Sequence, residues 1–119
     1  MKKIYIVDQI FDEEELKKVT QLALNLPYTH RSNDVGYYGN TDEHDMNILV
    51  YLQGEELLYN GTGFWTKENQ DGSVDLNTYI GFKINRGIFF NGGEIKHADL
   101  QGLGPSSPRY ALTLFLDRK

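Results

Sequence analysis

His97 and Arg109 are the two residues whose types and positions suggest chemistry most directly. His97 follows the glycine pair Gly92 and Gly93, and Arg109 opens an apolar run after a loop rich in glycine and proline. Imidazole nitrogen is a good ligand for transition metals, and a guanidinium binds a carboxylate through two parallel hydrogen bonds. His97 is therefore a candidate metal ligand, and the position of Arg109 at the head of the apolar run raises the question of what its charge serves.

A second group of possible metal ligands lies in the segment NTDEHD, which contains Asp42, His44 and Asp45. A non-haem Fe(II) site takes two histidines and one carboxylate on one face and keeps its other positions open. Because the chain has no cysteine, disulfides, thiolate catalysis and cysteine zinc sites are excluded. Any metal would therefore be held by histidine and oxygen ligands.

The composition limits the kinds of partner. The net charge is -5 and the 12 lysines and arginines are scattered, so the sequence offers no basic stripe for nucleic acid. No apolar run approaches the ~20 residues that a membrane helix needs, and the first residues turn acidic instead of forming a signal peptide. We expect a cytoplasmic protein with one domain over residues 1–119, without nucleic-acid or membrane partners.

One helix is predicted near the N-terminus, after the strand-like run KIYIVDQIF. Asp12 is its expected N-cap, the acidic residues after it suit the positive end of the helix dipole, and Pro27 ends it. Its apolar positions recur at helical spacing: Leu16, Val19, Leu22, Ala23 and Leu26.

The rest of the chain consists of short apolar runs broken by glycine, asparagine and aspartate. These runs are DVGYYGN, MNILVYLQ, GTGFWTKE, LNTYIGFKI, GIFFNG and RYALTLFLD. Such spacing after a single helix predicts a mainly β (α+β) fold, a jelly-roll barrel with the helix packed outside.

The order of several motifs resembles the 2-oxoglutarate- and Fe(II)-dependent oxygenases, in particular their small prolyl-4-hydroxylase-like members. The segments that carry the resemblance are NTDEHDMNILVYL, NGTGFWTKE, FKINRGIFFNGGEIKHA and RYALTLFL, in that order. The resemblance covers nearly the whole chain. It implies a double-stranded β-helix and a dioxygenase that hydroxylates a small-molecule or peptide substrate.

The resemblance also implies roles for particular residues. His97 matches the distal iron ligand, Asp42 matches the carboxylate ligand, and Arg109 matches the cation that holds the remote carboxylate of 2-oxoglutarate. Tyr51 or Tyr38 is expected to point into the same pocket, and Tyr51 is assigned to the cosubstrate.

The family's first histidine ligand has no counterpart at the matching position. The family motif His-x-Asp falls on Asn40-Thr41-Asp42, so asparagine stands where the histidine belongs. On a strand, residues two apart share a face, so His44 is predicted as the replacement ligand beside Asp42. Alternatively, Asn40 is a weak oxygen ligand, or the site has lost its iron.

Simpler roles compete with each assignment. His97 can be a strand-end histidine bonded to a backbone carbonyl, Asp42 and Asp45 can form turns, and Arg109 can be an edge-strand arginine paired with a surface carboxylate. At the level of function, the alternatives are a non-catalytic jelly-roll protein that binds a small carboxylate, and a cupin-like isomerase or dioxygenase that does not use 2-oxoglutarate.

Overall fold

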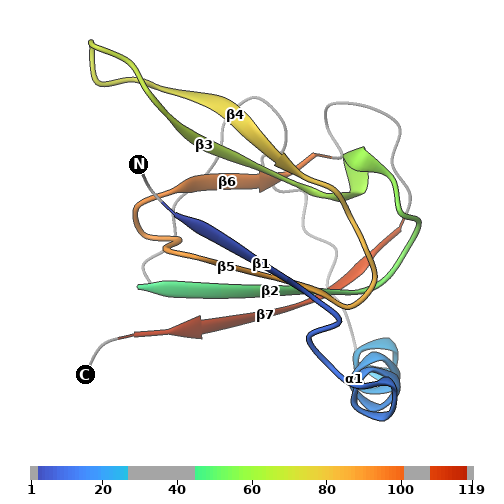
Figure 1. The fold of residues 1–119 in the computed structure, drawn as a ribbon. Coiled ribbons are helices and arrows are strands. Elements are labelled where there is room, and N and C mark those ends of the chain that lie inside the picture. Colours follow the sequence, from blue (N-terminus) through green and yellow to red (C-terminus); the bar gives the residue numbers. More distant parts are fainter. Residues whose placement is uncertain (1–2, 27–44, 101–107, 118–119) are drawn as a thin grey trace.

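The computed structural model describes residues 3–26, 45–100 and 108–117. Among them are one α-helix, a short 3-10 helix and several β-strands (Figure 1). The elements in chain order are β1 (Ile4–Asp8), α1 (Glu13–Asn25), β2 (Met46–Gln53), η1 (Leu58–Asn60), β3 (Thr62–Glu68), β4 (Val74–Ile80), β5 (Arg86–Phe90), β6 (Lys96–Asp99) and β7 (Tyr110–Leu116).

The strands form two antiparallel sheets. The larger sheet has the order β1-β5-β2-β7, and the smaller has the order β4-β3-β6. Every connection between β2 and β7 passes from one sheet to the other, except the hairpin that joins β3 to β4. The predicted mainly β fold with one helix is therefore confirmed.

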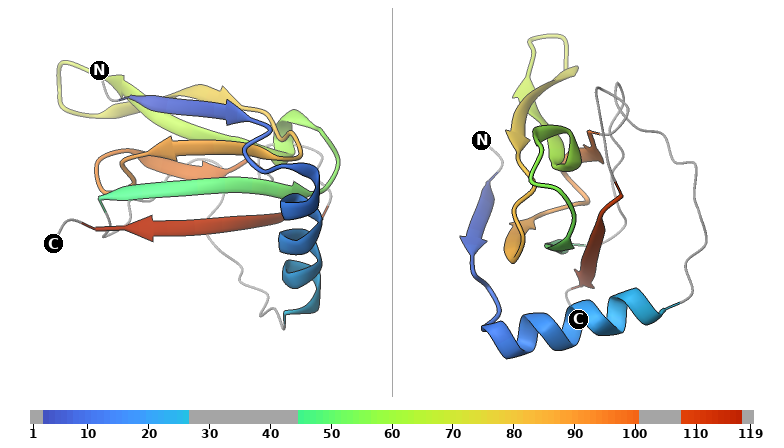
Figure 2. Two further views of the ribbon diagram at one scale, coloured as in Figure 1. Left: turned by 60° about the horizontal axis from the view of Figure 1, so that its bottom comes forward. Right: turned by 90° about the vertical axis from the view of Figure 1, so that its right-hand side faces the viewer.

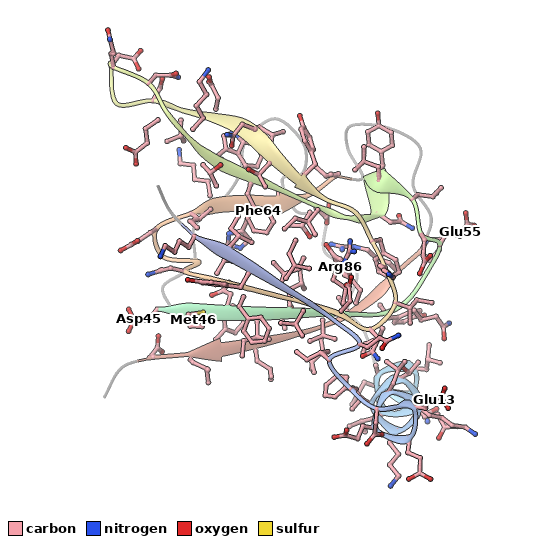
Figure 3. The ribbon with its side chains drawn as sticks, viewed as in Figure 1. Glu13, Asp45, Met46, Glu55, Phe64 and Arg86 are labelled. Carbon is pink, nitrogen blue, oxygen red and sulfur yellow. The ribbon has the colours of Figure 1, made fainter. Side chains whose placement is uncertain are left out.

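The core lies between the sheets. Its buried members are Tyr51, Phe64, Ile80, Phe82, Ile88, Phe90 and Ile95. Phe64 points from β3 toward the larger sheet (Figure 3), where its ring meets the ring of Phe90 edge-on at a centroid distance of 4.9 Å. Because β-strand side chains alternate between faces, Thr62 shares this inward face of β3 with Phe64.

Helix α1 begins as the sequence predicts. Asp12 is the N-cap and forms a capping box: its side chain accepts from the Glu15 backbone N–H, and the Glu15 carboxylate accepts from the Asp12 N–H. The helix crosses the end of the larger sheet at which β2 ends and β7 begins (Figure 2). It lies outside the sandwich, as expected.

Asn85 attaches the segment between β1 and α1 to the core. Its side chain accepts from the Phe11 N–H at 3.0 Å and donates to the Phe11 carbonyl at 2.7 Å. Its own backbone N–H donates to the Tyr51 carbonyl at 2.7 Å, and its carbonyl accepts from Ile10. Asn85 is buried and has a left-handed φ of 69°, a conformation that asparagine tolerates better than most residues.

Two of the strands differ from the sequence prediction, and one predicted run cannot be compared with the structure. The segment Lys96–Asp99 is a strand, although none of the apolar runs in the sequence covers it. The run LNTYIGFKI leaves the sheet at Ile80. The run DVGYYGN lies outside the described residues.

No helix in the described part of the chain is long and apolar enough to cross a membrane.

Candidate functional site

His97 lies on β6 and faces the space between the sheets. It pairs across the ladder with Phe64 of β3, and its ring packs edge-on against the Phe90 ring of β5 at 4.8 Å. The His97 Nδ1 lies 2.9 Å from the Ile95 carbonyl oxygen. Because a carbonyl oxygen only accepts, Nδ1 donates that bond, and metal-binding histidines are commonly oriented by a bond of this kind from their other ring nitrogen.

The same hydrogen bond also fits the simpler role of a strand-end histidine. Sequence reasoning had offered both roles, and the contact to the Ile95 carbonyl is common to them. The His97 ring contacts the rings of Phe64 and Phe90, so His97 is half-buried among aromatic side chains.

Arg109 precedes β7 and reaches across to the smaller sheet. Its Nη1 donates to the Asn60 carbonyl at 2.9 Å, and its guanidinium carbon lies 5.4 Å from the centre of the Tyr51 ring. Its Nη2 lies 4.0 Å from the Asp99 Oδ2, which is an ion pair beyond hydrogen-bond distance. Only 15% of the Arg109 side chain is exposed, so its charge is partly withdrawn from water.

Tyr51 lies beneath the guanidinium. It is fully buried in β2, and its hydroxyl lies 2.5 Å from the Thr62 Oγ1 on β3. Burial raises the pKa of Tyr51, although the hydrogen bond to Thr62 and the charge of Arg109 act in the opposite direction. The phenol therefore keeps its proton at neutral pH and serves as a hydrogen-bond donor or acceptor.

Asp99 is absent from the predicted site, although it completes a His-x-Asp triplet with His97. The two residues are separated by one position on β6, so they share a face of the strand. The Asp99 Oδ1 is buried and has no hydrogen-bond partner within the described residues. The i, i+2 rule that was applied to Asp42 and His44 would have identified it.

Together, His97, Asp99, Tyr51 and Arg109 form what we call the inter-sheet cluster. The smaller sheet contributes His97 and Asp99, β2 contributes Tyr51, and the start of β7 contributes Arg109. The cluster combines one histidine, one carboxylate, one phenol and one guanidinium, and its phenol and histidine contact the apolar core.

The other residues of the predicted site lie away from the cluster or outside the described residues. Tyr38, Asn40, Asp42 and His44 lie outside the described residues. Asp45 is described, and it lies at the start of β2, at the opposite end of that strand from Tyr51 (Figure 3). Its backbone N–H donates to the Asp117 carboxylate at 3.1 Å, so within the described structure it closes an exposed strand end.

A complete metal centre is not formed by residues 3–26, 45–100 and 108–117 alone. Among them, no three side chains of histidine, aspartate, glutamate or cysteine come together as ligands. The predicted roles of His97, Asp42 and His44 as iron ligands therefore stay predictions.

Comparisons with known proteins give no assignment. No protein-family model, no curated protein and no solved structure matches this chain.

Proposed function

We propose that this protein is a small 2-oxoglutarate- and Fe(II)-dependent dioxygenase that hydroxylates a small-molecule or peptide substrate. The observation that carries the proposal is the inter-sheet cluster: Arg109 lies over the Tyr51 ring and pairs with Asp99, which is two positions from His97 on β6. His97, Tyr51 and Arg109 are far apart in the sequence, and the resemblance assigned all of them to one site.

The topology supports the double-stranded β-helix that the proposal requires. In a jelly roll, two antiparallel sheets face each other and the chain repeatedly passes between them. The strands from β2 to β7 follow that pattern, with β7-β2-β5 on one side and β4-β3-β6 on the other. The interior between such sheets is a common place for metal and ligand sites.

His97 fits a metal ion through the hydrogen bond between Nδ1 and the Ile95 carbonyl, which fixes the ring. In the proposal, Fe(II) is held by His97, Asp42 and His44. The metal would supply oxygen activation, and overall one atom of O2 enters succinate while the other enters the hydroxylated product, with release of CO2.

Arg109 and Tyr51 have the chemistry to hold the cosubstrate. The guanidinium keeps its charge when it is partly buried and donates from a rigid plane, and the Tyr51 hydroxyl is protonated at neutral pH. In the proposal they bind the remote end of 2-oxoglutarate, while the buried aromatic rings around His97 exclude water from the reacting end.

The test is the release of succinate from 2-oxoglutarate by the full chain supplied with Fe(II), ascorbate and a panel of amino acids, peptides and nucleosides. His97→Ala is expected to abolish succinate release, whereas Lys96→Ala, a change at the exposed neighbouring position, is expected to retain it. Equal turnover by both variants would remove His97 from the site.

A second candidate is a non-catalytic protein that binds a small polar ligand at Arg109. The ion pair with Asp99 favours it, because the guanidinium already has a counter-charge from its own chain. Metal analysis separates the candidates: a protein that takes up no iron, cobalt or manganese from an excess is not the dioxygenase.

A further inference from the structure

We propose that the outer face of the larger sheet is the interface of a homodimer, in which two copies of this face pack against each other about a two-fold axis. The outer face is the side of the sheet that is turned away from the core. Tyr51, Ile88 and Phe90 point into the core, so the residues next to them along each strand point outward. Because Tyr51 of the inter-sheet cluster lies on the other side of the sheet, the inference does not depend on the proposed function.

The outward positions of the larger sheet carry no charged side chain in the described strands. The pairing of the strands places some of these positions in a row that crosses the whole sheet: Leu114, Ile48, Phe89 and Tyr5. An antiparallel sheet with one face in water normally has polar residues on that face, and the smaller sheet follows this rule with Lys96 at an outward position. A sheet that is apolar on both faces is therefore expected to be covered on both.

Helix α1 covers only one end of this face. It crosses the sheet where β2 ends and β7 begins (Figure 2), and Val50 and Leu52 near that end are 1% and 2% exposed. Farther from the helix, large outward side chains are between 36% and 56% exposed: Tyr5, Met46, Leu114 and Leu116. The face is thus sealed at one end and open over the rest of its length.

The open part of the face is large enough for a reversible dimer. Strands lie about 4.8 Å apart and rise about 3.4 Å per residue, so the four strands over positions 46–50 form a face of roughly 19 by 17 Å, or roughly 300 Å² in projection. Two such faces bury at least twice that area, and more because side chains stand out from the sheet. This lies at the low end of specific interfaces, which favours association in the micromolar range.

The position of α1 determines how a second copy fits. A two-fold axis parallel to the strands would bring both helices to the same end and hold the sheets apart. An axis perpendicular to the strands, along the row that contains Leu114, places the helices at opposite ends, so the open parts meet at the ~10 Å spacing of packed sheets. A partner that recognises charge finds none to pair with on this face, whereas a second copy offers an apolar surface of the same size and shape.

The first test is sedimentation velocity of the full chain across a concentration series from low micromolar to submillimolar. The wild-type protein is expected to dimerise, and Leu114→Asp is expected to weaken the dimer by about tenfold or more, since it buries two facing carboxylates. The matched control is Thr113→Asp, because Thr113 is exposed and pairs with Leu49 on the side of the sheet that faces the core. It is expected to change the dimer Kd by less than about twofold. Thermal melts of each variant verify that it is folded.

A second test uses the absence of cysteine from the chain. Leu114→Cys places a thiol beside its own counterpart across the axis, so a short bis-maleimide is expected to link two copies of this variant. Thr113→Cys places the thiol on the other side of the sheet and is expected to give little linked dimer. This measurement adds no charge to the interface, so it holds even where Leu114→Asp does not fold.

Several outcomes would overturn the inference. One is a wild-type protein that stays monomeric at every concentration, and another is a dimer that Leu114→Asp leaves intact and that is not linked through Leu114→Cys. A monomer that binds phosphatidylcholine vesicles through Leu114 would assign the face to a lipid surface. A monomer in which the Leu114→Cys thiol resists labelling would assign the cover of the face to the chain itself.

Discussion

Individual side chains of this protein connect different elements of the fold. The hydroxyl of Tyr51 bonds Thr62 across the two sheets, and Asn85 bonds the backbone of Phe11 in the segment before the helix. Both residues are buried or nearly so. A buried polar group that loses its partner destabilises the fold more than an exposed one. Substitutions at these positions are therefore expected to change the free energy of unfolding measurably.

Asn85→Ala is expected to lower the free energy of unfolding by about 2–4 kcal/mol, because it removes both side-chain bonds to Phe11 and leaves a strained left-handed residue. Asn85→Gly lacks the same bonds but adopts the positive φ without strain, so it is expected to recover about 1 kcal/mol of that loss. Urea denaturation measures both variants. Equal stability of the two would mean that the conformation of Asn85 carries no strain.

The Tyr51–Thr62 hydrogen bond is suited to a double-mutant cycle. Tyr51→Phe leaves the buried Thr62 hydroxyl unpaired, and Thr62→Val leaves the phenol unpaired, so each is expected to cost about 1–2 kcal/mol. The double variant removes both groups and is expected to lose about 1 kcal/mol less than the sum of the single changes. Strictly additive losses would contradict the hydrogen bond.

At the scale of elements, the helix and the strands that local sequence patterns determine could be predicted from the sequence. The cap at Asp12 and the proline at position 27 marked the helix, and the runs that became β2, β3 and β7 were visible as apolar stretches. No apolar run marked the bounds of β6, because Lys96–Asp99 is short and polar. It is a strand because β3 pairs with it through Thr62 to Trp65, and no local pattern encodes that long-range pairing.

Gly61, just before β3, is where two elements approach too closely for a side chain. A Cβ there would clash with the Ile80 carbonyl oxygen of β4, whereas a Cβ at Gly81 would meet nothing within 4 Å. Gly61→Ala is therefore expected to destabilise the protein by about 3 kcal/mol or more. Gly81→Ala is the control and is expected to stay within about 0.5 kcal/mol of wild type, as judged by thermal melts. Similar losses for both would mean that the backbones do not approach this closely.

The first strand is held to its neighbour by an ion pair at one end. The Arg86 Nε and Nη2 donate to the two Asp8 carboxylate oxygens at 2.7 and 3.2 Å, and this hydrogen bonding lowers the pKa of Asp8. A lowered carboxyl pKa stabilises the fold above the unfolded-state pKa, and the stabilisation is lost as the pH falls through the folded-state pKa. The pair is partly exposed, so its contribution is below about 1 kcal/mol.

Asp8→Asn therefore tests this contribution through acid sensitivity. Compared with wild type, the variant is expected to be less stable at pH 7 by up to about 1 kcal/mol, and the difference is expected to shrink below about pH 4. Urea denaturation at a series of pH values measures it. A difference that persists unchanged at pH 2.5 would show that Asp8 acts through packing instead of charge.

At the scale of the whole molecule, the sheet arrangement brings the cluster together. Sequence order assigned His97, Tyr51 and Arg109 to one site, but it did not include Asp99, whose place beside Arg109 depends on the pairing of β6 with β3 and on the start of β7. Distances across two sheets are a tertiary property, so a pattern read along one strand cannot supply them.

Ligand binding at this cluster is expected to stabilise the whole fold, since it joins both sheets. If the proposed function holds, 2-oxoglutarate added together with Mn(II), at a concentration about a hundredfold above the Kd of 2-oxoglutarate, is expected to raise the Tm of the wild-type protein by about 10 °C. Arg109→Lys keeps the charge but loses the planar donors and is expected to reduce the rise by about half. Thermal melts with and without the ligands measure this, and an equal rise for both proteins would exclude Arg109 from binding.

The hairpin between β3 and β4 extends beyond the rest of the sandwich (Figure 1). Its turn is closed by its own bonds, with the Asn69 N–H donating to the Ser73 carbonyl at 2.9 Å, and Gly72 at its tip has open space around it. Loop tips of this kind tolerate insertions well. A fluorophore or an affinity peptide placed after Asp71 would therefore report on or immobilise the protein without touching the residues that would bind its ligand.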